Sequence, residues 1–160
     1  MSWLRKFFGA PTQLLPQVRM HVLADAQAPE RKTGGAAGFD LYANLGTNTV
    51  KLSPGQRTTI PCGVRLELPP GVEAQIRGRS GLANRNGIQV LNSPGTIDSD
   101  YRGEIHAILH NSSTAMGFTI KHGDRIAQMV FARYLIPVLQ ITKRLSETER
   151  GSKGFGSTGT

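Results

Sequence analysis

Apolar and polar residues alternate along several short stretches of the chain. Residues 18–23 read Val-Arg-Met-His-Val-Leu, and residues 36–43 return to an extended pattern after a polar stretch rich in turn formers. Successive side chains of a strand point to opposite faces, so this alternation predicts strands with one buried face. By the same criterion we expect strands within residues 49–68, 88–91, 104–110, 117–120 and 138–142, and a turn leading into a strand over 123–131.

Proline and glycine interrupt the chain at close intervals. Turn signals occur at Ser53-Pro54-Gly55, at Pro61 and at Pro69-Pro70-Gly71. No long helical period separates the predicted strands, whereas a parallel α/β fold would need helical crossovers. A brief helix is expected only over Ser80–Asn84, with Ser80 as its N-cap. The pattern therefore predicts an antiparallel all-β domain, either a sandwich or a barrel.

Length and cysteine content limit the class of protein. A chain of 160 residues suits one domain with a substantial core. Cys62 is the only cysteine, so no disulfide can form within the chain, which fits a reducing cytoplasm. No apolar stretch approaches the length of a membrane span. We therefore expect a cytoplasmic protein with no membrane partner.

The charge balance favours an anionic partner. The chain has 19 Lys and Arg against 11 Asp and Glu, a formal net charge of +8. Either nucleic acid or a small polyphosphate would satisfy this charge, and charge alone does not choose between them. Aromatic residues make up 6% of the chain, and no basic run is interleaved with them, so no specific nucleic-acid binding is expected.

The two ends of the chain differ in composition from the middle. Residues 1–16 carry a basic pair but no secretory signal, and Pro11 and Pro16 interrupt any longer helix, which predicts a loosely ordered leader. A short amphipathic turn that touches a partner or a membrane surface is the alternative. The β domain is expected over residues 17–142. Residues 143–160 are too rich in glycine and polar residues to build a core, and form a flexible arm.

The richest candidate chemistry lies in residues 93–104. Pro94-Gly95 is a turn signal and Thr96-Ile97 is β-branched, so Asp98 is expected at the end of a tight hairpin. A carboxylate held there could act as a general base for a water molecule. An Asx turn, in which Asp98 bonds only its own backbone, is the alternative.

Other polar residues stand in conspicuous positions. Gly78-Arg79-Ser80-Gly81 offers a guanidinium, a hydroxyl and bare N–H groups to a phosphate. Asn92 brings a donor and an acceptor to the base of the hairpin. Gln128 is the uncharged polar residue of an apolar run and faces either solvent or a ligand. Asp40 lies among apolar neighbours and is either an exposed strand residue or a buried charge that needs a partner.

Five stretches resemble, in order, the motifs of the trimeric dUTPases, the enzymes that split dUTP into dUMP and pyrophosphate. The resemblance runs from Val18 to Thr160, and Thr96 stands where the family usually shows a hydrophobic residue. The five stretches are Ala37-Gly38-Phe39-Asp40-Leu41-Tyr42-Ala43, Gly78-Arg79-Ser80-Gly81-Leu82-Ala83, residues 95–104 (Gly-Thr-Ile-Asp-Ser-Asp-Tyr-Arg-Gly-Glu), Gly123-Asp124-Arg125-Ile126-Ala127-Gln128, and Arg150-Gly151 through Gly154-Phe155-Gly156-Ser157-Thr158-Gly159.

The resemblance implies a jelly-roll-like distorted barrel, assembled as a homotrimer with exchanged C-terminal arms and active sites between subunits. It implies that Asp98 is the general base and that Tyr101 packs under deoxyribose. Asn92 and the backbone of Thr96, Ile97 and Asp98 would recognise uracil, with His106 beside that pocket.

The resemblance also assigns the phosphate end of the site. Mg²⁺ would be the cofactor, bound mainly through the triphosphate with no direct protein ligand. Asp40 would lie near the phosphates and act through water, through the metal or through a pairing with Arg150, and the sequence leaves this choice open. The phosphate contacts would be Arg79, Ser80, Gly81 and Gln128, and the closing arm would supply Arg150, Phe155, Gly156, Ser157 and Thr158.

The implied activity, dUTP hydrolysis, would keep uracil out of DNA and supply dUMP for thymidylate synthesis. Two other functions stay open. A deaminase of dCTP uses a similar fold, but Asp98 followed by Asp100-Tyr101 and the glycine-rich arm favour hydrolysis. A regulatory nucleotide-binding or protein-interaction module is the other alternative.

Overall fold

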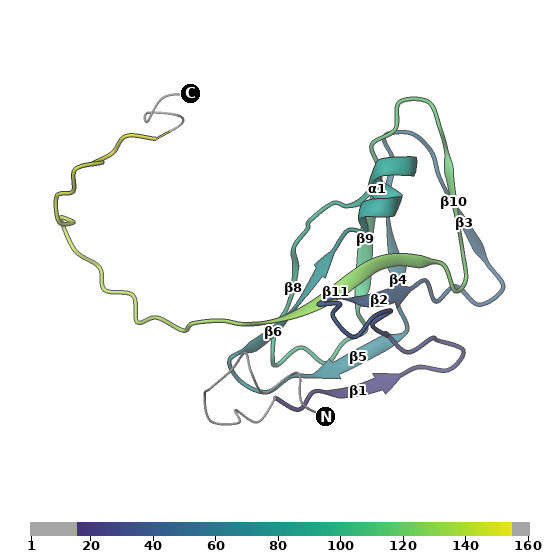
Figure 1. Cartoon of the computed structure of the whole chain (residues 1–160), viewed down its shortest axis with the longest axis horizontal. Helices are drawn as coiled ribbons and strands as arrows, with labels where there is room; N and C mark the ends of the chain where they lie inside the picture. The colour runs from purple at the N-terminus through teal and green to yellow at the C-terminus, as the bar shows by residue number, and fades with distance from the viewer. Residues whose placement is uncertain (1–15, 155–160) are drawn as a thin grey trace.

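A computed structural model describes residues 16–154 of the chain as a β body from which one long extended segment departs (Figure 1). The one helix of this range is α1 (Ser80–Asn86). The strands are β1 (Arg19–Val22), β2 (Phe39–Tyr42), β3 (Thr49–Leu52), β4 (Arg57–Pro61), β5 (Val64–Glu67), β6 (Val72–Arg77), β7 (Ile88–Val90), β8 (Gly95–Ile97), β9 (His106–Asn111), β10 (Phe118–Lys121) and β11 (Arg125–Arg133).

The strands pair antiparallel in four small sheets. The largest has the order β2-β11-β6-β8, the next has the order β4-β9-β7, and β1-β5 and β10-β3 form two-stranded sheets. The pairings within residues 16–154 do not close into a barrel, because β2 and β8 remain the two edges of the largest sheet. The prediction of an antiparallel all-β domain is confirmed.

The core is built from the buried face of each strand. In β9, Ala107 and Leu109 are fully buried while His106 faces out, as the alternation of a strand requires. Asn111 continues the buried face and is fully buried itself; its amide donates to the carbonyl oxygens of Leu52 (3.0 Å) and Met116 (2.8 Å). These bonds satisfy the polar group inside the core and tie β9 to β3.

Two local predictions are wrong. Residues 138–142 form no strand, and the last ladder residue is Arg133. Val138 is 96% exposed, so the described residues of this chain give the segment nothing to pair with or pack on. Ser80 is not the N-cap of α1: Arg79 occupies that position with an extended backbone, and no side chain caps the helix.

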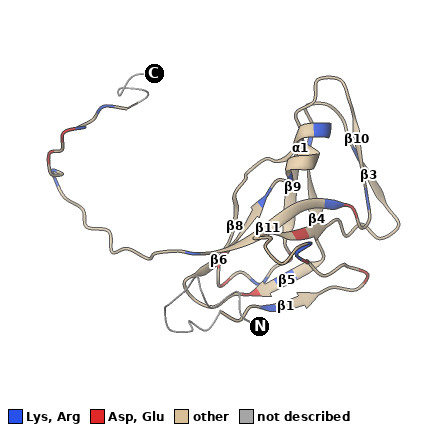
Figure 2. Cartoon of the chain, viewed as in Figure 1, with Lys and Arg blue, Asp and Glu red and all other residues tan. Residues whose placement is uncertain are grey.

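No helix in the part of the chain that the structure describes has the length and apolar character needed to span a membrane. Figure 2 shows the basic residues spread over separate elements, among them β1, β11 and α1.

Candidate functional site

Most residues predicted to bind the nucleoside line one cavity of about 430 Å³, which we call the β8 pocket. It lies where β8 ends and the chain turns back toward β9. Six of its lining residues were predicted from the sequence: Asn92, Thr96, Ile97, Asp98, Tyr101 and His106. Thr59, Glu104 and Ile108 complete the lining and were not predicted.

The turns before and after β8 hold these residues in place by close packing. Gly95 is buried, and a Cβ atom there would lie 3.0 Å from Nδ2 of Asn92, so the Asn92 amide packs directly on the glycine. β8 then pairs with β6 from Gly95 to Ile97. Asp98 follows immediately, and the Tyr101 N–H closes the turn on its main-chain oxygen at 3.2 Å. Asp98 follows the extended residues of β8, as predicted, but the predicted tight hairpin is wrong, because β8 pairs with β6 and not with the strand before or after it.

The side chain of Asp98 is exposed and forms no hydrogen bond or ion pair with residues 16–154. The turn is held by main-chain atoms, so the Asx-turn alternative does not describe this segment. The other carboxylate that lines this pocket is engaged: Oε1 of Glu104 accepts from the Gly63 N–H at 2.8 Å. Asp98 is therefore free to bind a water molecule.

A second group of predicted residues is centred on Asp40. Its carboxylate accepts from Nε of Arg79 at 3.1 Å and from Nη1 of Arg125 at 3.0 Å, and Arg79 also donates to the Arg125 carbonyl at 2.9 Å. Only 14% of the Asp40 side chain is exposed. Figure 2 shows the acidic position on β2 beside the basic start of β11. The exposed-residue alternative for Asp40 is wrong, and its partners within residues 16–154 are Arg79 and Arg125.

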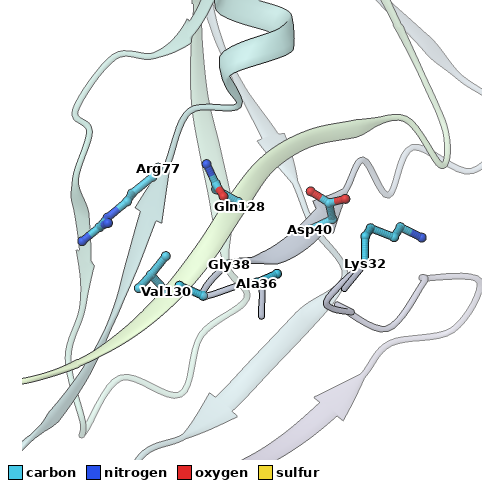
Figure 3. A pocket seen from close by; sticks show the side chains of 8 residues that line it. Lys32, Ala36, Gly38, Asp40, Arg77, Gln128 and Val130 are labelled. Atoms are coloured by element: carbon cyan, nitrogen blue, oxygen red, sulfur yellow. The ribbon is translucent and has the colours of Figure 1, made fainter. Parts of the chain in front are cut away.

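Gln128 lines a second cavity, which we call the β11 pocket. There it lies on β11 between Arg77 of β6 and Asp40 of β2 (Figure 3). Its amide donates to the Gly78 carbonyl at 2.8 Å, which fixes the backbone just before Arg79. A Cβ atom on Gly38 would lie 2.4 Å from Oε1 of Gln128, so a larger residue there would displace the Gln128 amide. The pocket has a volume of about 360 Å³ and is lined by Lys32, Ala36, Ala37, Gly38, Asp40, Arg77, Gln128 and Val130.

Lys32 adds a positive charge at this pocket that the sequence did not single out. Its ammonium bonds Oε1 of Glu30 and lies over the ring of Tyr42, whose hydroxyl donates to the same oxygen at 2.7 Å. The hydrogen bond from Lys32 holds the pKa of Glu30 below its ordinary value and raises the pKa of Lys32. Burial, followed by the bond to Glu30, raises the pKa of Tyr42. Lys32 therefore stays charged at neutral pH.

Ser80 and Gly81 open α1 on the surface next to Arg79. The Ser80 side chain is exposed, and the first N–H groups of a helix have no partner within it. The guanidinium of Arg85 packs back over Gly81, where a Cβ atom would lie 2.9 Å from Nη2. The hydroxyl and N–H groups expected to meet a phosphate are thus accessible.

The described part of the arm, residues 143–154, lines neither pocket. Nε of Arg150 donates to the Lys153 carbonyl at 3.0 Å, within an exposed segment that runs away from the β body (Figure 1). The β8 and β11 pockets share no lining residue. Four further predicted residues, Phe155, Gly156, Ser157 and Thr158, lie outside the described residues.

The chemistry of the side chains bears on metal binding. Within residues 16–154 no three His, Cys, Asp or Glu side chains come together in a way that could hold a metal ion. Both oxygens of Asp40 already accept hydrogen bonds from arginine. The carboxylate of Asp98 is the unengaged one in the β8 pocket.

Comparison with known proteins gives one consistent family. The sequence model of the dUTPase family matches residues 24–159. A deoxyuridine 5'-triphosphate nucleotidohydrolase of Roseobacter denitrificans is 53% identical over 131 residues, which are 82% of this chain and 86% of that protein. The protein of the same name from Brucella melitensis is 49% identical over 153 residues, 95% of this chain and 96% of its own length.

Solved structures agree with the fold. The dUTPase of Staphylococcus bacteriophage 80alpha, solved with dUPNHPP, has a TM-score of 0.80 at 26% identity and covers 90% of this chain and 99% of its own. The dUTPase from phage phi11 of S. aureus has a TM-score of 0.71 at 22% identity and covers 82% of this chain and 99% of its own.

Proposed function

This chain belongs to the dUTPase family and hydrolyses dUTP to dUMP and pyrophosphate, and we propose that Asp98 activates the attacking water. The observation that carries this proposal is the unengaged carboxylate of Asp98 in a pocket lined by five other residues expected around the nucleoside. A general base must be free to accept a proton and must be held beside the reacting group. The first condition is supported by the absence of a partner for the Asp98 carboxylate within residues 16–154, and the second by its place directly after β8 in the pocket.

The nucleoside is proposed to bind along β8. Because β8 is an edge strand, part of its backbone N–H and C=O groups pairs with no other strand within residues 16–154. Uracil presents an N–H donor between two carbonyl acceptors, and the backbone of Thr96 to Asp98 together with the Asn92 amide can supply the complementary groups. Cytosine reverses part of this pattern and leaves buried polar groups unpaired, which is a strong form of rejection. Thymine would be excluded by its 5-methyl group.

Tyr101 and His106 are proposed to form the wall of this pocket. Tyr101 packs under the deoxyribose and leaves no room for a 2′-hydroxyl. His106 faces out from β9 beside it.

The triphosphate is proposed to bind Arg79, Ser80, Gly81 and Gln128. Asp40 holds Arg79 and Arg125 in a fixed orientation, with one negative charge between two positive ones, so a net positive charge faces the phosphates. Gln128 orients the same segment through Gly78. Such preorganised donors stabilise the charge that develops during phosphoryl transfer. Mg²⁺, when bound, is held mainly by the triphosphate oxygens and neutralises part of their charge, with Asp40 in contact at most through water.

We propose that the complete site is assembled in a homotrimer. The β8 pocket, the residues around Asp40 and the arm are separate in one chain, yet hydrolysis needs the base, the phosphate contacts and the closing arm together. The segment that leaves β11 also exposes apolar residues that a second copy would bury: Leu135, Ile136, Val138, Leu139, Ile141 and Leu145. Exchange of this arm would place Arg150, Phe155, Gly156, Ser157 and Thr158 over a neighbour's nucleotide.

The chain is proposed to act in the cytoplasm, where it keeps uracil out of DNA and supplies dUMP. Its division into a leader (1–16), a β domain (17–142) and an arm (143–160) is likewise a proposal. The described chain leaves the sheets after Arg133, so the boundary at 142 falls inside the extended segment.

A pyrophosphate-release assay on a panel of nucleotides tests this function. We expect rapid release from dUTP, which falls when a chelator removes Mg²⁺, and little release from dCTP, dTTP or UTP. Ammonia production from dCTP would instead identify a deaminase. Binding of dUTP without turnover, with Mg²⁺ present, would favour a regulatory module.

A further inference from the structure

Glu104 links two side chains that line the β8 pocket, those of Tyr101 and His106, to the turn between β4 and β5. Its main-chain oxygen accepts from the Tyr101 hydroxyl at 3.0 Å and lies 2.9 Å from Nδ1 of His106. Because a carbonyl only accepts, Nδ1 carries the proton in that contact. Its side chain points elsewhere: Oε1 accepts from the Gly63 N–H at 2.8 Å. One residue thus fixes two side chains that face the ligand and is itself fixed by a third contact.

The turn that holds the Glu104 carboxylate is rigid. Gly63 lies between β4 and β5 with a φ of 69°, and a Cβ atom there would lie 2.2 Å from that of Ala26. Its carbonyl accepts from the Leu23 N–H at 2.8 Å. On the other side, the Ile105 N–H donates to the Val64 carbonyl at 2.8 Å, so the residue after Glu104 is bonded to the same turn. The Gly63 N–H is therefore a fixed anchor point.

The Tyr101 ring has little else to hold it. Tyr101 is 43% exposed, so burial alone does not fix its position. The ring lies directly over Gly103, where a Cβ atom would be 2.3 Å from the hydroxyl oxygen and 2.5 Å from Cζ. The bare face of Gly103 and the Glu104 carbonyl are thus the contacts that set the ring against the pocket.

We propose that Glu104 is the positioning residue for Tyr101, and that rejection of ribonucleotides depends on its carboxylate. This inference rests on the proposed function, in which Tyr101 excludes the 2′-hydroxyl. A steric gate discriminates only while its wall is held in place, because a shift of the ring by a fraction of the size of a hydroxyl opens the space. Without the bond to Gly63, the Ile105 N–H bond to Val64 is the remaining main-chain tether of the peptide that carries the Glu104 carbonyl, and the peptide can pivot about it and shift the ring.

The measured quantity is the ratio of kcat/KM for dUTP to kcat/KM for UTP. Glu104→Ala should lower this ratio about tenfold, the effect of losing one charge-assisted hydrogen bond at a positioning residue. Glu104→Gln keeps an oxygen acceptor for the Gly63 N–H and should stay within about twofold of the wild-type ratio. The matched control is Glu67→Ala, which removes an exposed carboxylate paired with Arg19 and should leave the ratio unchanged.

Two further variants separate positioning from general destabilisation. Gly103→Ala leaves the Glu104 carboxylate in place but forces the ring aside, and should lower the ratio as Glu104→Ala does. Tyr101→Phe removes the hydroxyl that bonds the Glu104 carbonyl. Adding Glu104→Ala to Tyr101→Phe should then lower the ratio little further, because both changes break the same link.

The inference is overturned if Glu104→Ala or Gly103→Ala keeps the wild-type ratio, or if the effects of Glu104→Ala and Tyr101→Phe multiply. If Glu104→Ala does not fold, Tyr101→Phe decides, because an unchanged ratio there means that the bond to the Glu104 carbonyl does not position the ring. A wild-type protein that fails to hydrolyse dUTP would instead overturn the proposed function.

Discussion

Three carboxylates line the two pockets, and their partners differ. Asp40 is held by two arginines and Glu104 by the Gly63 N–H. The carboxylate of Asp98 has no partner within residues 16–154. A general base needs a carboxylate that the attacking water can reach, and protein donors already occupy the other two. The surroundings, rather than the residue type, therefore single out Asp98.

Asp98→Asn tests this choice with almost no change in shape. We expect kcat to fall by about a thousandfold or more, because an amide cannot accept a proton from water. Affinity for a non-hydrolysable dUTP analogue should change only a few-fold, since the backbone of β8 is untouched. Pyrophosphate release and titration calorimetry measure the two effects, with Glu67→Gln as the carboxylate control. Turnover close to that of the wild type would exclude Asp98 as the base.

Cys62 gives a separate test of the packing. Burial raises the pKa of its thiol to about 12, so the native protein holds almost no thiolate at pH 8. In the unfolded chain a thiol ionises near its ordinary pKa of about 8.5. A thiol reagent such as dithionitrobenzoate should therefore react rapidly in urea and slower by orders of magnitude without it, with the native rate still rising above pH 9. Fast reaction of the folded protein at pH 8 would show that this part of the core opens easily.

Strands could be predicted wherever the information was local. β1, β2 and β9 each show alternation along the strand and turn residues at their ends, and each was expected close to its observed bounds. Residues 138–142 have similar apolar character but no strand, because a strand also needs a partner and the partner is not in the local sequence. The N-cap of α1 was predicted at Ser80 because serine is a preferred N-cap residue. The backbone of Ser80 is already helical, so the N-cap is the residue before it.

Site residues that are neighbours in the sequence were predicted, and site residues that only strand pairing brings together were missed. Asn92, Asp98 and Tyr101 come from one continuous stretch, so turn chemistry placed them together. Thr59 reaches the β8 pocket only because β4 pairs with β9, a register the sequence does not state. Arg125 was missed as the second partner of Asp40, since that contact joins residues 85 positions apart.

The turn between β4 and β5 allows a matched glycine test. Gly63 and Gly55 have similar positive φ values, 69° and 72°, but a Cβ atom would strike Ala26 at Gly63 and would meet nothing within 4 Å at Gly55. Gly55→Ala should therefore cost only the backbone strain, about 1 kcal/mol, and Gly63→Ala at least about 2 kcal/mol more. Urea unfolding at a fixed protein concentration measures both. Equal costs would mean that the turn can move away from Ala26.

The proposed trimer accounts for the extended segment after β11. A folded monomer would leave a run of apolar side chains from Leu135 to Leu145 in water, which favours association. In a trimer the same run can pack on a neighbour and carry the residues beyond Arg150 to that neighbour's nucleotide. The predicted assembly thus explains both the missing strand at residues 138–142 and the separation of the arm from the pockets.

Mixing two inactive variants tests whether one site draws on different subunits. One variant is full-length Asp98→Asn, and the other is a chain that ends at Glu149, which should fold normally and lose most turnover. When the two are refolded together in equal amounts, about a quarter of the sites in a cyclic trimer should combine Asp98 from a truncated chain with the arm of an intact one. Pyrophosphate release should rise to about that fraction of the wild-type rate, provided that random assembly holds. The matched control replaces the truncated chain by one that also carries Asp98→Asn and should stay inactive. If the base and the arm of a single chain served the same site, the mixture would be no more active than its two components.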